Sequence, residues 1–363
     1  MKLRGAATAV MGAAVVASTA LAGTAAAAPP APAEWSVTSL TRLTGNEYLS
    51  DLAATGSTSA WAVGGSWSAE NRPLLYRWSG SWQQVPVPAQ VDTALGHVAA
   101  SSDTNVWAFG TRAQENPALK AFRWNGTAWR ASVVESGDVW LRDADVLSPS
   151  NVWLAVSGGS GAEPLRRWDG GTWRRVAAPA DNVHAMHFTS ARSGWAVGDA
   201  GGLPRMLRWN GSAWKSVALP RIPVPEGATA ALSDVLALSP TNVWAVGATT
   251  RLVGDDEEFR PIVLNWNGSA WRTVTTPDYR FDLSNLAPDG DGGFWVMGGV
   301  ETLVHHRAGT WTAVPRPTLP ETDGAFGRMV NVPGTKTMLG VGWATPWGAP
   351  EDDGSDGVFF AAR

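Results

Sequence analysis

Residues 242–247 read Asn-Val-Trp-Ala-Val-Gly, and residues 265–271 read Asn-Trp-Asn-Gly-Ser-Ala-Trp. The first stretch is a short apolar run that ends in glycine, which is typical of a strand buried on both faces. The second places an Asn-Gly pair between short apolar runs, which favours a hairpin with a two-residue turn and positive φ at both turn residues. Another apolar run, at residues 232–238, precedes both. This unit is therefore predicted to contain four short strands, ordered inner, second, third and outer.

Copies of this unit recur along the chain. The tryptophans of the first motif are Trp61, Trp107, Trp153, Trp195, Trp244 and Trp295. They follow one another in steps of 46, 46, 42, 49 and 51 residues, and a copy of the hairpin motif follows each of them. A period of roughly 40–50 residues with four strands per unit is typical of a β-propeller.

A seventh unit is divided between the two ends of the chain. Residues 338–342 match the first motif without its tryptophan, and residues 358–363 match a third strand. Residues 35–38 resemble the segment that follows each hairpin turn, so they supply the missing outer strand. We therefore predict an all-β, seven-bladed β-propeller of four-stranded antiparallel blades. The N-terminal strand is predicted to pair with the C-terminal blade, which closes the ring and removes two exposed sheet edges.

Most of the tryptophans belong to this repeat. Of the 22 tryptophans, 18 fall in repeated columns when Trp35 is included. Because the repeat itself explains these positions, we expect their side chains to pack between blades rather than to form a sugar-stacking array. The other four are Trp67, Trp140, Trp343 and Trp347.

The N-terminus has the pattern of a secretory signal. Lys2 and Arg4 precede a weakly apolar stretch, and small residues at 25–28 suit cleavage. We therefore expect residues 1–28 to be a signal peptide, residues 29–34 a short Pro/Ala linker and residues 35–363 a single propeller domain. The protein is then secreted and extracellular. It is not expected to span a membrane after cleavage, because no later segment has 18 consecutive apolar residues.

Charge and composition narrow the range of partners. The formal net charge is -4, and removal of Lys2 and Arg4 with the signal would make it -6. Nucleic acid is not expected as a partner, since its recognition normally needs a basic face. The chain has no cysteine, so no disulfide stabilises it. A closed ring of seven sheets can bury enough apolar area without a disulfide. We expect a monomer.

Polar residues recur ten or eleven positions before each first-motif tryptophan, where the inner strands are predicted to begin. These positions include Asp51, His97, Asp143, His184, Asp234 and Asn285. Side chains of this kind that converge on one axis could bind a small polar ligand at the mouth of the channel. Two of the carboxylates could also act as acid and base. A polar lining of a water-filled channel would produce the same pattern.

Two further features could contribute to binding. Trp67, Trp343 and Trp347 fall in predicted loops of units one and seven, where exposed aromatic rings would suit a carbohydrate or a protein hot spot. Packing of these rings against their own loops is the alternative. Acidic loops, such as residues 255–258 and 351–357, could attract calcium (Ca²⁺) or a basic partner. They lack the pattern of an EF-hand loop, and a solvated rim explains them equally well.

The hairpin motif resembles that of bacterial neuraminidase-repeat (Asp-box) propellers. In that family a Ser-x-Asp-x-Gly-x-x-Trp hairpin joins the third and fourth strands. Residues 168–173, Trp-Asp-Gly-Gly-Thr-Trp, come closest, whereas the other copies replace the Asp with Asn or Ser and all lack the leading Ser. The resemblance covers roughly residues 35–363 and implies the fold. It does not imply the sialidase site, because the chain has only three tyrosines and no recognisable arginine triad.

No nucleophile elbow, zinc signature or phosphate-binding loop is present in the sequence. We therefore predict a secreted, non-catalytic binding module with no cofactor, which recognises an extracellular glycan or protein at the channel mouth and the loops around it. The alternatives are an extracellular polysaccharide hydrolase or lyase that uses the channel carboxylates, and a structural protein of the cell envelope.

Overall fold

All regular structure in the described part of the chain is β-strand. The computed structural model describes residues 34–42, 45–66, 72–112, 116–158, 163–349 and 354–363. Twenty-eight strands form seven antiparallel sheets of four strands each. The predicted signal peptide, and all of the predicted linker except Glu34, lie outside the described residues.

Each sheet is one blade, and its strands run from the inside of the ring outwards. Blade I contains β2 (Glu47–Gly56), β3 (Ser59–Ser66), β4 (Pro73–Trp78) and β5 (Trp82–Gln84). Blade II contains β6 (His97–Ser102), β7 (Asn105–Arg112), β8 (Ala118–Trp124) and β9 (Trp129–Ser136). Blade III contains β10 (Val139–Ser148), β11 (Asn151–Gly158), β12 (Leu165–Trp168) and β13 (Trp173–Val176). Blade IV contains β14 (Asn182–Ser190), β15 (Ser193–Ala200), β16 (Leu203–Trp209) and β17 (Trp214–Val217).

The remaining blades follow the same order. Blade V contains β18 (Thr229–Ser239), β19 (Asn242–Val253), β20 (Asp256–Trp266) and β21 (Trp271–Thr273). Blade VI contains β22 (Leu283–Pro288), β23 (Phe294–Gly298), β24 (Thr302–Arg307) and β25 (Thr310–Pro315). Blade VII contains β26 (Thr322–Asn331), β27 (Met338–Pro346), β28 (Asp356–Ala362) and, as its outer strand, β1 (Trp35–Leu40).

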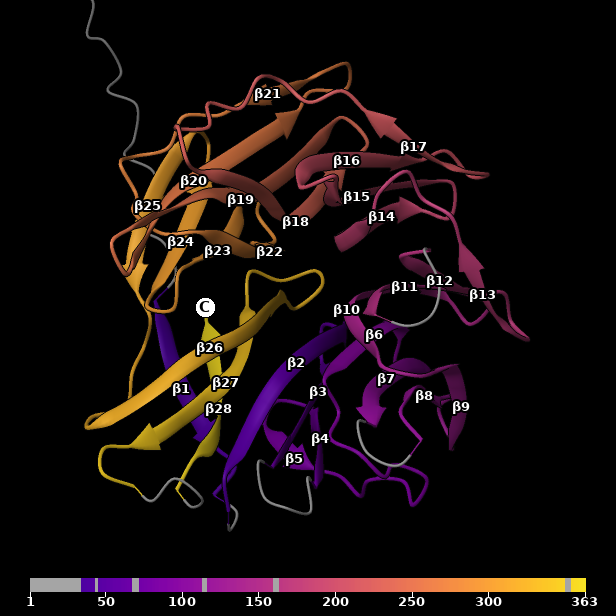
Figure 1. The fold of residues 1–363 in the computed structure, drawn as a ribbon. Helices are drawn as coiled ribbons and strands as arrows, with labels where there is room; N and C mark the ends of the chain where they lie inside the picture. Colours follow the sequence, from indigo (N-terminus) through magenta and orange to yellow (C-terminus); the bar gives the residue numbers. More distant parts are fainter. Residues whose placement is uncertain (1–33, 43–44, 67–71, 113–115, 159–162, 350–353) are drawn as a thin grey trace, which may run out of the picture. The chain divides into compact units, whose positions relative to one another are not determined.

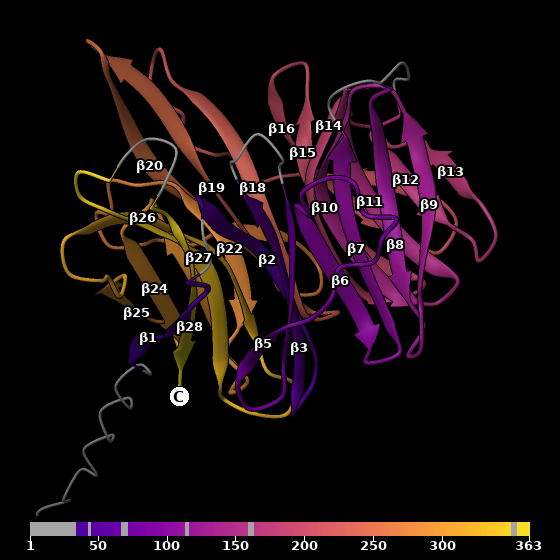
Figure 2. The same ribbon diagram turned by 90° about the horizontal axis from the view of Figure 1, so that it is seen from below.

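The ring closes as the sequence predicts. Each inner strand contacts the inner strand of the next blade, and β26 of blade VII contacts β2 of blade I. The N-terminal strand β1 pairs with β28 from Trp35 opposite Ala362 to Leu40 opposite Val358. Figures 1 and 2 show these two strands, indigo and yellow, side by side. The predicted seven-bladed propeller with terminal pairing is therefore confirmed.

The core lies between blades and is rich in tryptophan. Trp61 of β3 packs against Trp124 and Trp129 of the next blade, with ring centroids 6.1 and 5.7 Å away. The same arrangement recurs at Trp107 with Trp168 and Trp173, at Trp153 with Trp209 and Trp214, and at Trp195 with Trp266 and Trp271. The predicted packing of the repeated tryptophans between blades is therefore confirmed.

The hairpins between third and outer strands correct one prediction. Trp124 pairs directly with Trp129, so four residues, not two, form the loop. Gly126 has a φ of 96°, but Asn125 does not have positive φ. The Asn125 side-chain oxygen instead accepts hydrogen bonds from the backbone N–H groups of Thr127 and Ala128. Asn favours this local turn because its short side chain reaches the backbone of the following residues.

Candidate functional site

The inner strands are interrupted at the height of the predicted polar ring. The pairing register of β2 with β3 shifts between Leu49 and Asp51, and that of β10 with β11 shifts between Leu141 and Asp143. Corresponding shifts occur in β14, β18, β22 and β26. A β-bulge re-aims the side chains beside it. All of the predicted polar residues except His97 therefore lie at bulges within the inner strands rather than at the strand starts that the sequence predicted. His97 is the first residue of β6, as predicted.

In four blades, a polar side chain at the bulge accepts a hydrogen bond from a backbone N–H of the next blade. The Val98 N–H donates to Asp51 Oδ2 at 3.0 Å, and the Met186 N–H donates to Asp143 Oδ2 at 2.7 Å. The equivalent bonds of the other two blades run from Leu286 N–H to Asp234 Oδ2 at 2.7 Å and from Met329 N–H to Asn285 Oδ1 at 3.3 Å. These four side chains thus join blades I to II, III to IV, V to VI and VI to VII.

Other side chains at the bulges donate hydrogen bonds to backbone carbonyl oxygens that belong to the next blade. Ser50 Oγ donates to the Leu95 carbonyl oxygen at 3.0 Å, and Ser233 Oγ donates to that of Leu283 at 2.5 Å. His184 Nδ1 donates to the carbonyl oxygen of Leu232 in the next blade at 2.9 Å. The buried backbone groups at these blade junctions are thereby satisfied, which removes the cost of leaving them unpaired.

Arg328 lies in the channel between these carboxylates. Its guanidinium is 3.5 Å from Asp51 Oδ1 through Nε and 3.4 Å from Asp143 Oδ1 through a terminal nitrogen. The cavity that Arg328 lines together with Asp51 and Asp143 has a volume of about 260 Å³. Burial acts to lower the pKa of Arg328, but the charges of Asp51, Asp143 and Asp234 outweigh it and raise the pKa.

Two carboxyl groups in this region hold their protons more tightly than usual. Burial raises the pKa of Asp145 to about 7, against the opposing hydrogen bond from the Phe188 N–H. Burial likewise raises the pKa of Asp234 to about 6, although the charge of Arg328 works to lower it. The channel is therefore a site where carboxyl groups titrate close to neutral pH.

The two predicted histidines do not enter the channel cavity together. His97 Nδ1 lies 3.6 Å from Asp51 Oδ2, and the ring lines a different hollow. His184 lies near the start of β14, and its Nε2 is 3.1 Å from Asp199 Oδ2. The structure thus brings Asp51 and Asp143 together around Arg328 but leaves His97 and His184 with separate partners. Binding of a ligand by these residues stays a prediction.

The structure describes two of the three predicted loop tryptophans, and one of these two lies in a strand. Trp67 lies outside the described residues. Trp343 is in strand β27, paired with Ala325 and Gly357, so its assignment to a loop was wrong. Residues 338–344 are paired on both sides, and a hydropathy pattern does not show where such pairing ends. Trp347 is 66% exposed, and its indole N–H donates to Asp323 Oδ1 at 3.3 Å.

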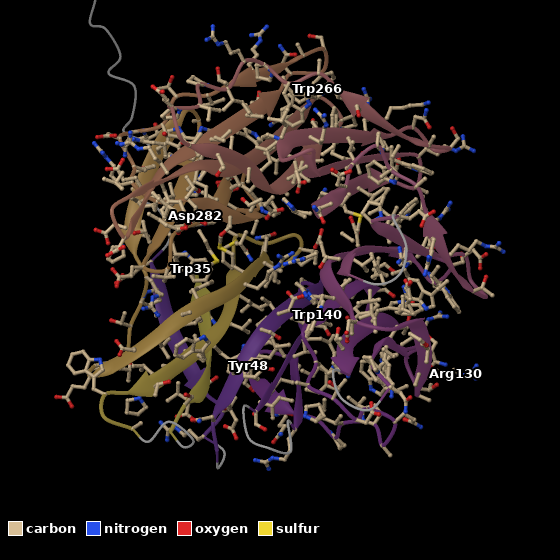
Figure 3. The ribbon with its side chains drawn as sticks, in the orientation of Figure 1. Trp35, Tyr48, Arg130, Trp140, Trp266 and Asp282 are labelled. Atoms are coloured by element: carbon tan, nitrogen blue, oxygen red, sulfur yellow. The ribbon has the colours of Figure 1, made fainter. Side chains whose placement is uncertain are left out.

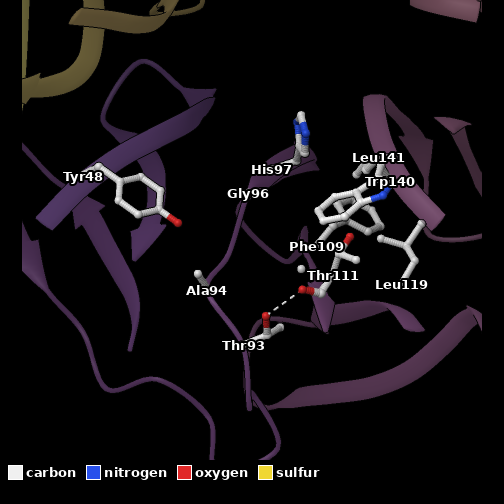
Figure 4. Close-up of a pocket in the computed structure, with 11 residues that line it drawn as sticks. Tyr48, Thr93, Ala94, Gly96, His97, Phe109, Thr111, Leu119, Trp140 and Leu141 are labelled. Atoms are coloured by element: carbon white, nitrogen blue, oxygen red, sulfur yellow. Dashed lines mark hydrogen bonds between the residues drawn. The ribbon is translucent and has the colours of Figure 1, made fainter. Parts of the chain in front are cut away.

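A hollow of about 300 Å³ lies on the top face, the end of the ring where the inner strands begin. It is bounded by Tyr48 of blade I, by Phe109 of blade II and by Trp140 of blade III. Trp140 is 51% exposed. Figure 4 shows Tyr48 on one side of the hollow, with Trp140 and His97 on the other.

The polar groups of this hollow are arranged by the backbone around it. Thr93 Oγ1 donates to the Thr111 carbonyl oxygen at 2.9 Å, and Thr111 Oγ1 donates to that of Val139 at 3.2 Å. Both hydroxyl protons are therefore engaged, and the hydroxyl oxygens remain as acceptors. The hollow combines aromatic walls with acceptors, which suits an apolar group that has a hydrogen-bond donor beside it.

No metal centre is evident in the part of the chain that the structure describes: no group of three or more His, Asp or Glu side chains is arranged to hold an ion. Residues 351–353 of the acidic loop lie outside that part. Among the described residues there is also no helix long and apolar enough to cross a membrane.

Comparison with known proteins shows the fold and not the family. No protein-family model matches the sequence, and no curated protein matches it. Solved propellers do match the structure. YCF48 bound to a D1 peptide has a TM-score of 0.55 and 14% identity, over 92% of this chain and 98% of that one. YCF48 from Cyanidioschyzon merolae has a TM-score of 0.55 and 13% identity, over 91% and 98%.

A GH74 xyloglucanase from Xanthomonas campestris has a TM-score of 0.57 and 14% identity. The match covers 88% of this chain but only 55% of the xyloglucanase. At this identity the likeness concerns the fold alone, since one fold hosts many functions. The Asp-box resemblance is thus supported at the level of the propeller and not at the level of a family.

Sequence reasoning missed Trp140, Tyr48 and Arg328 as site residues. Arg328 falls in the same pair of aligned positions, ten or eleven residues before the first-motif column, as Asp51 and Asp143, so an alignment of the units contains the signal. Trp140 was recognised as lying outside the repeat, and its exposure at the start of β10 could have been proposed from that. Nothing in the sequence brings Tyr48 to the same hollow, because the pairing of three blades does so.

Proposed function

We propose that this chain is a non-catalytic binding module that acts outside the cell and holds a segment of another protein on its top face. The observation that carries the proposal is the hollow bounded by Tyr48, Phe109 and Trp140, with Trp140 half exposed. Tryptophan and tyrosine are among the residues enriched in protein–protein hot spots, and both border this hollow.

The chemistry of the channel supports binding over catalysis. The carboxylates of Asp51 and Asp143 each accept a backbone N–H from the next blade and face Arg328. A general acid or base needs a free oxygen within reach of the substrate. The bonding of these two carboxylates therefore counts against the alternative of a polysaccharide hydrolase or lyase that uses them. YCF48, which shares the fold, has been solved with a peptide bound, and that supports a protein ligand for a propeller of this kind.

The test is a selection of peptides from a displayed random library on the immobilised protein, followed by Kd measurements on the selected peptides. Trp140→Ala should weaken binding by about 30-fold or more, which corresponds to the roughly 2 kcal/mol of a hot-spot residue. Trp347→Ala is the matched control, because it removes an indole of similar exposure from blade VII. Equal affinity of the wild-type protein and Trp140→Ala would contradict the proposal, as would a glycan ligand that depends on Trp140.

A further inference from the structure

The charged residues of the outer strands are distributed unevenly around the ring. The outer strands β9, β13, β17 and β21 of blades II–V expose five cations, namely Arg130, Arg174, Arg175, Lys215 and Arg272. The single carboxylate on these four strands, Glu135, is 91% buried and bonded to Arg166 and Arg175. The outer strands β5, β25 and β1 of the other three blades contain no charged residue. One side of the periphery is therefore basic although the chain as a whole is acidic.

Four of these cations occupy the same structural position. Arg130, Arg174, Lys215 and Arg272 each directly follow the tryptophan that begins the outer strand, and all four are exposed. We call these four residues the basic rim. Gln83 holds the equivalent position in blade I. Figure 3 shows Arg130 at the outer edge of the ring, away from the top-face residues Tyr48 and Trp140.

The pairing register sets cations against cations. Arg130 is directly opposite Arg123, Arg174 opposite Arg167 and Lys215 opposite Arg208. Like charges directly opposite on neighbouring strands are destabilising. Three successive blades nevertheless keep this arrangement. A destabilising arrangement that recurs at one structural position more often serves a function than arises by chance.

In each of these pairs, the arginine on the third strand has a structural role that explains its presence. The guanidinium groups of Arg123, Arg167 and Arg208 lie 5.6, 5.0 and 5.2 Å from the ring centroids of Trp107, Trp153 and Trp195. Such cation–π contacts hold each of these arginines over a tryptophan of its own blade.

The outer member has no comparable role. Arg174 pairs with Asp169 at 2.6 Å, yet 70% of its side chain remains exposed. Within the described ranges, no carboxylate oxygen lies within 4.0 Å of Arg130, Lys215 or Arg272. These three cations are therefore available to a ligand.

We propose that the basic rim is a docking surface for an anionic polysaccharide. Regularly repeated cations suit a polymer with regularly repeated anionic groups, and burying the counter-charges would relieve the repulsion between the opposed cations. Single-stranded nucleic acid is disfavoured, because its bases need exposed aromatic platforms. The tryptophans next to the rim are packed against the preceding blade, as in the contacts of Trp214 and Trp271. The rim is distinct from the top-face hollow, so the two surfaces could hold different ligands at once.

The experiment compares the wild-type protein with a rim variant, Arg130→Gln/Arg174→Gln/Lys215→Gln/Arg272→Gln. Glutamine is the residue that blade I carries at this position, so the fold should tolerate it. The control variant, Arg42→Gln/Arg142→Gln/Arg192→Gln/Arg221→Gln, removes the same charge from exposed arginines outside the outer strands. The probes are heparin, which is sulfated, polygalacturonate, which is carboxylated, and single-stranded DNA. Affinity is measured at several salt concentrations, and circular dichroism confirms that each variant is folded.

We expect the wild-type protein and the control variant to bind heparin or polygalacturonate in a salt-dependent manner. The rim variant should lose at least about tenfold in affinity, together with most of the salt dependence, because fewer counterions are released. Binding of one polyanion and not the other would identify the anionic group. Three results would overturn the proposal: equal loss in the control and rim variants, no binding of either polysaccharide by the wild-type protein, or tighter binding of the DNA than of both polysaccharides.

Discussion

Replacing Asp51 with alanine should destabilise the protein, because the Asp51 carboxylate joins blade I to blade II. The substitution leaves the buried N–H of Val98 without its acceptor, which costs about 1–3 kcal/mol. It also removes one of the carboxylates around Arg328. Arg328 keeps Asp143 and is 38% exposed, so this second effect adds only about 1 kcal/mol. The free energy of unfolding should therefore fall by about 2–4 kcal/mol, and Tm by roughly 3–6 °C for a domain of this size.

Asparagine at the same position is the informative comparison. Asn285 already makes the equivalent link in blade VI, where its side-chain oxygen accepts the Met329 N–H at 3.3 Å. Asp51→Asn should therefore keep the link to Val98 through its amide oxygen. It should lose the charge and the hydrogen bond that Asp51 Oδ1 accepts from the Leu52 N–H, at a cost of about 1–2 kcal/mol. Urea denaturation monitored by tryptophan fluorescence measures both variants under the same conditions.

A free energy of unfolding for Asp51→Ala that is within 0.5 kcal/mol of the wild-type value, or above it, would contradict this structural role of Asp51. Residues kept for ligand binding are commonly neutral or stabilising when replaced, because function rather than stability selects them. Such a result would instead favour a ligand-binding role for Asp51.

Three further results are expected. Asp145→Asn should raise the free energy of unfolding above pH 7 by up to about 4 kcal/mol and leave it unchanged near pH 4. The folded protein holds the Asp145 proton up to about pH 7, whereas the unfolded chain releases it near pH 3.8. The wild-type protein therefore loses stability as the pH rises through that window. Urea denaturation at pH 4, 5.5 and 8 checks it, and an unchanged pH profile would contradict it. Trp195→Ala should cost about 3–5 kcal/mol, because this 1% exposed ring fills the junction of blades IV and V, whereas Trp347→Ala, at 66% exposure, should stay within about 0.5 kcal/mol; equal melting temperatures for the two variants would refute this account of the core. A chain that begins at residue 41 lacks β1 and leaves β28 as an open edge, so light scattering should detect aggregation and calorimetry a lower Tm; a monomer as stable as the full ring would show that the closure is dispensable.

The sequence predicts the ring well because the residues that hold it together are repeated. Trp107 and Trp153 mark the same position in successive blades, and their spacing sets the blade size. The match of the first and last segments predicts that the N-terminal strand completes the last blade, where the structure places Trp35 opposite Ala362. These features depend on local composition and on period, which a single sequence contains.

The role of the channel residues could not be predicted in the same way. A β-bulge adds one residue to a strand without a distinctive composition, so the sequence does not show that Asp51 is re-aimed toward Val98 of the next blade. The hairpin loops differ from expectation for a related reason. The Asn125 side chain binds two backbone N–H groups, which stabilises a four-residue loop where Asn-Gly alone suggests two.

The top-face hollow depends on three blades at once. Tyr48, Phe109 and Trp140 are distant in sequence, and only the curvature of the ring brings them together. The basic rim can be read in part from the sequence. Its cations are visible in the sequence as the residue after each hairpin tryptophan, but their opposition to the arginines of the third strands needs the register.

The central claim is that the polar ring of the channel joins the blades to one another. Amide hydrogen exchange of Val98, Met186, Leu286 and Met329 tests it most directly, because these four N–H groups are the ones that the ring residues bind. The account predicts that all four exchange as slowly as the amides of the buried second strands, through global unfolding. Exchange at the rate of exposed loop amides would show that the channel side chains are free, and would contradict the account.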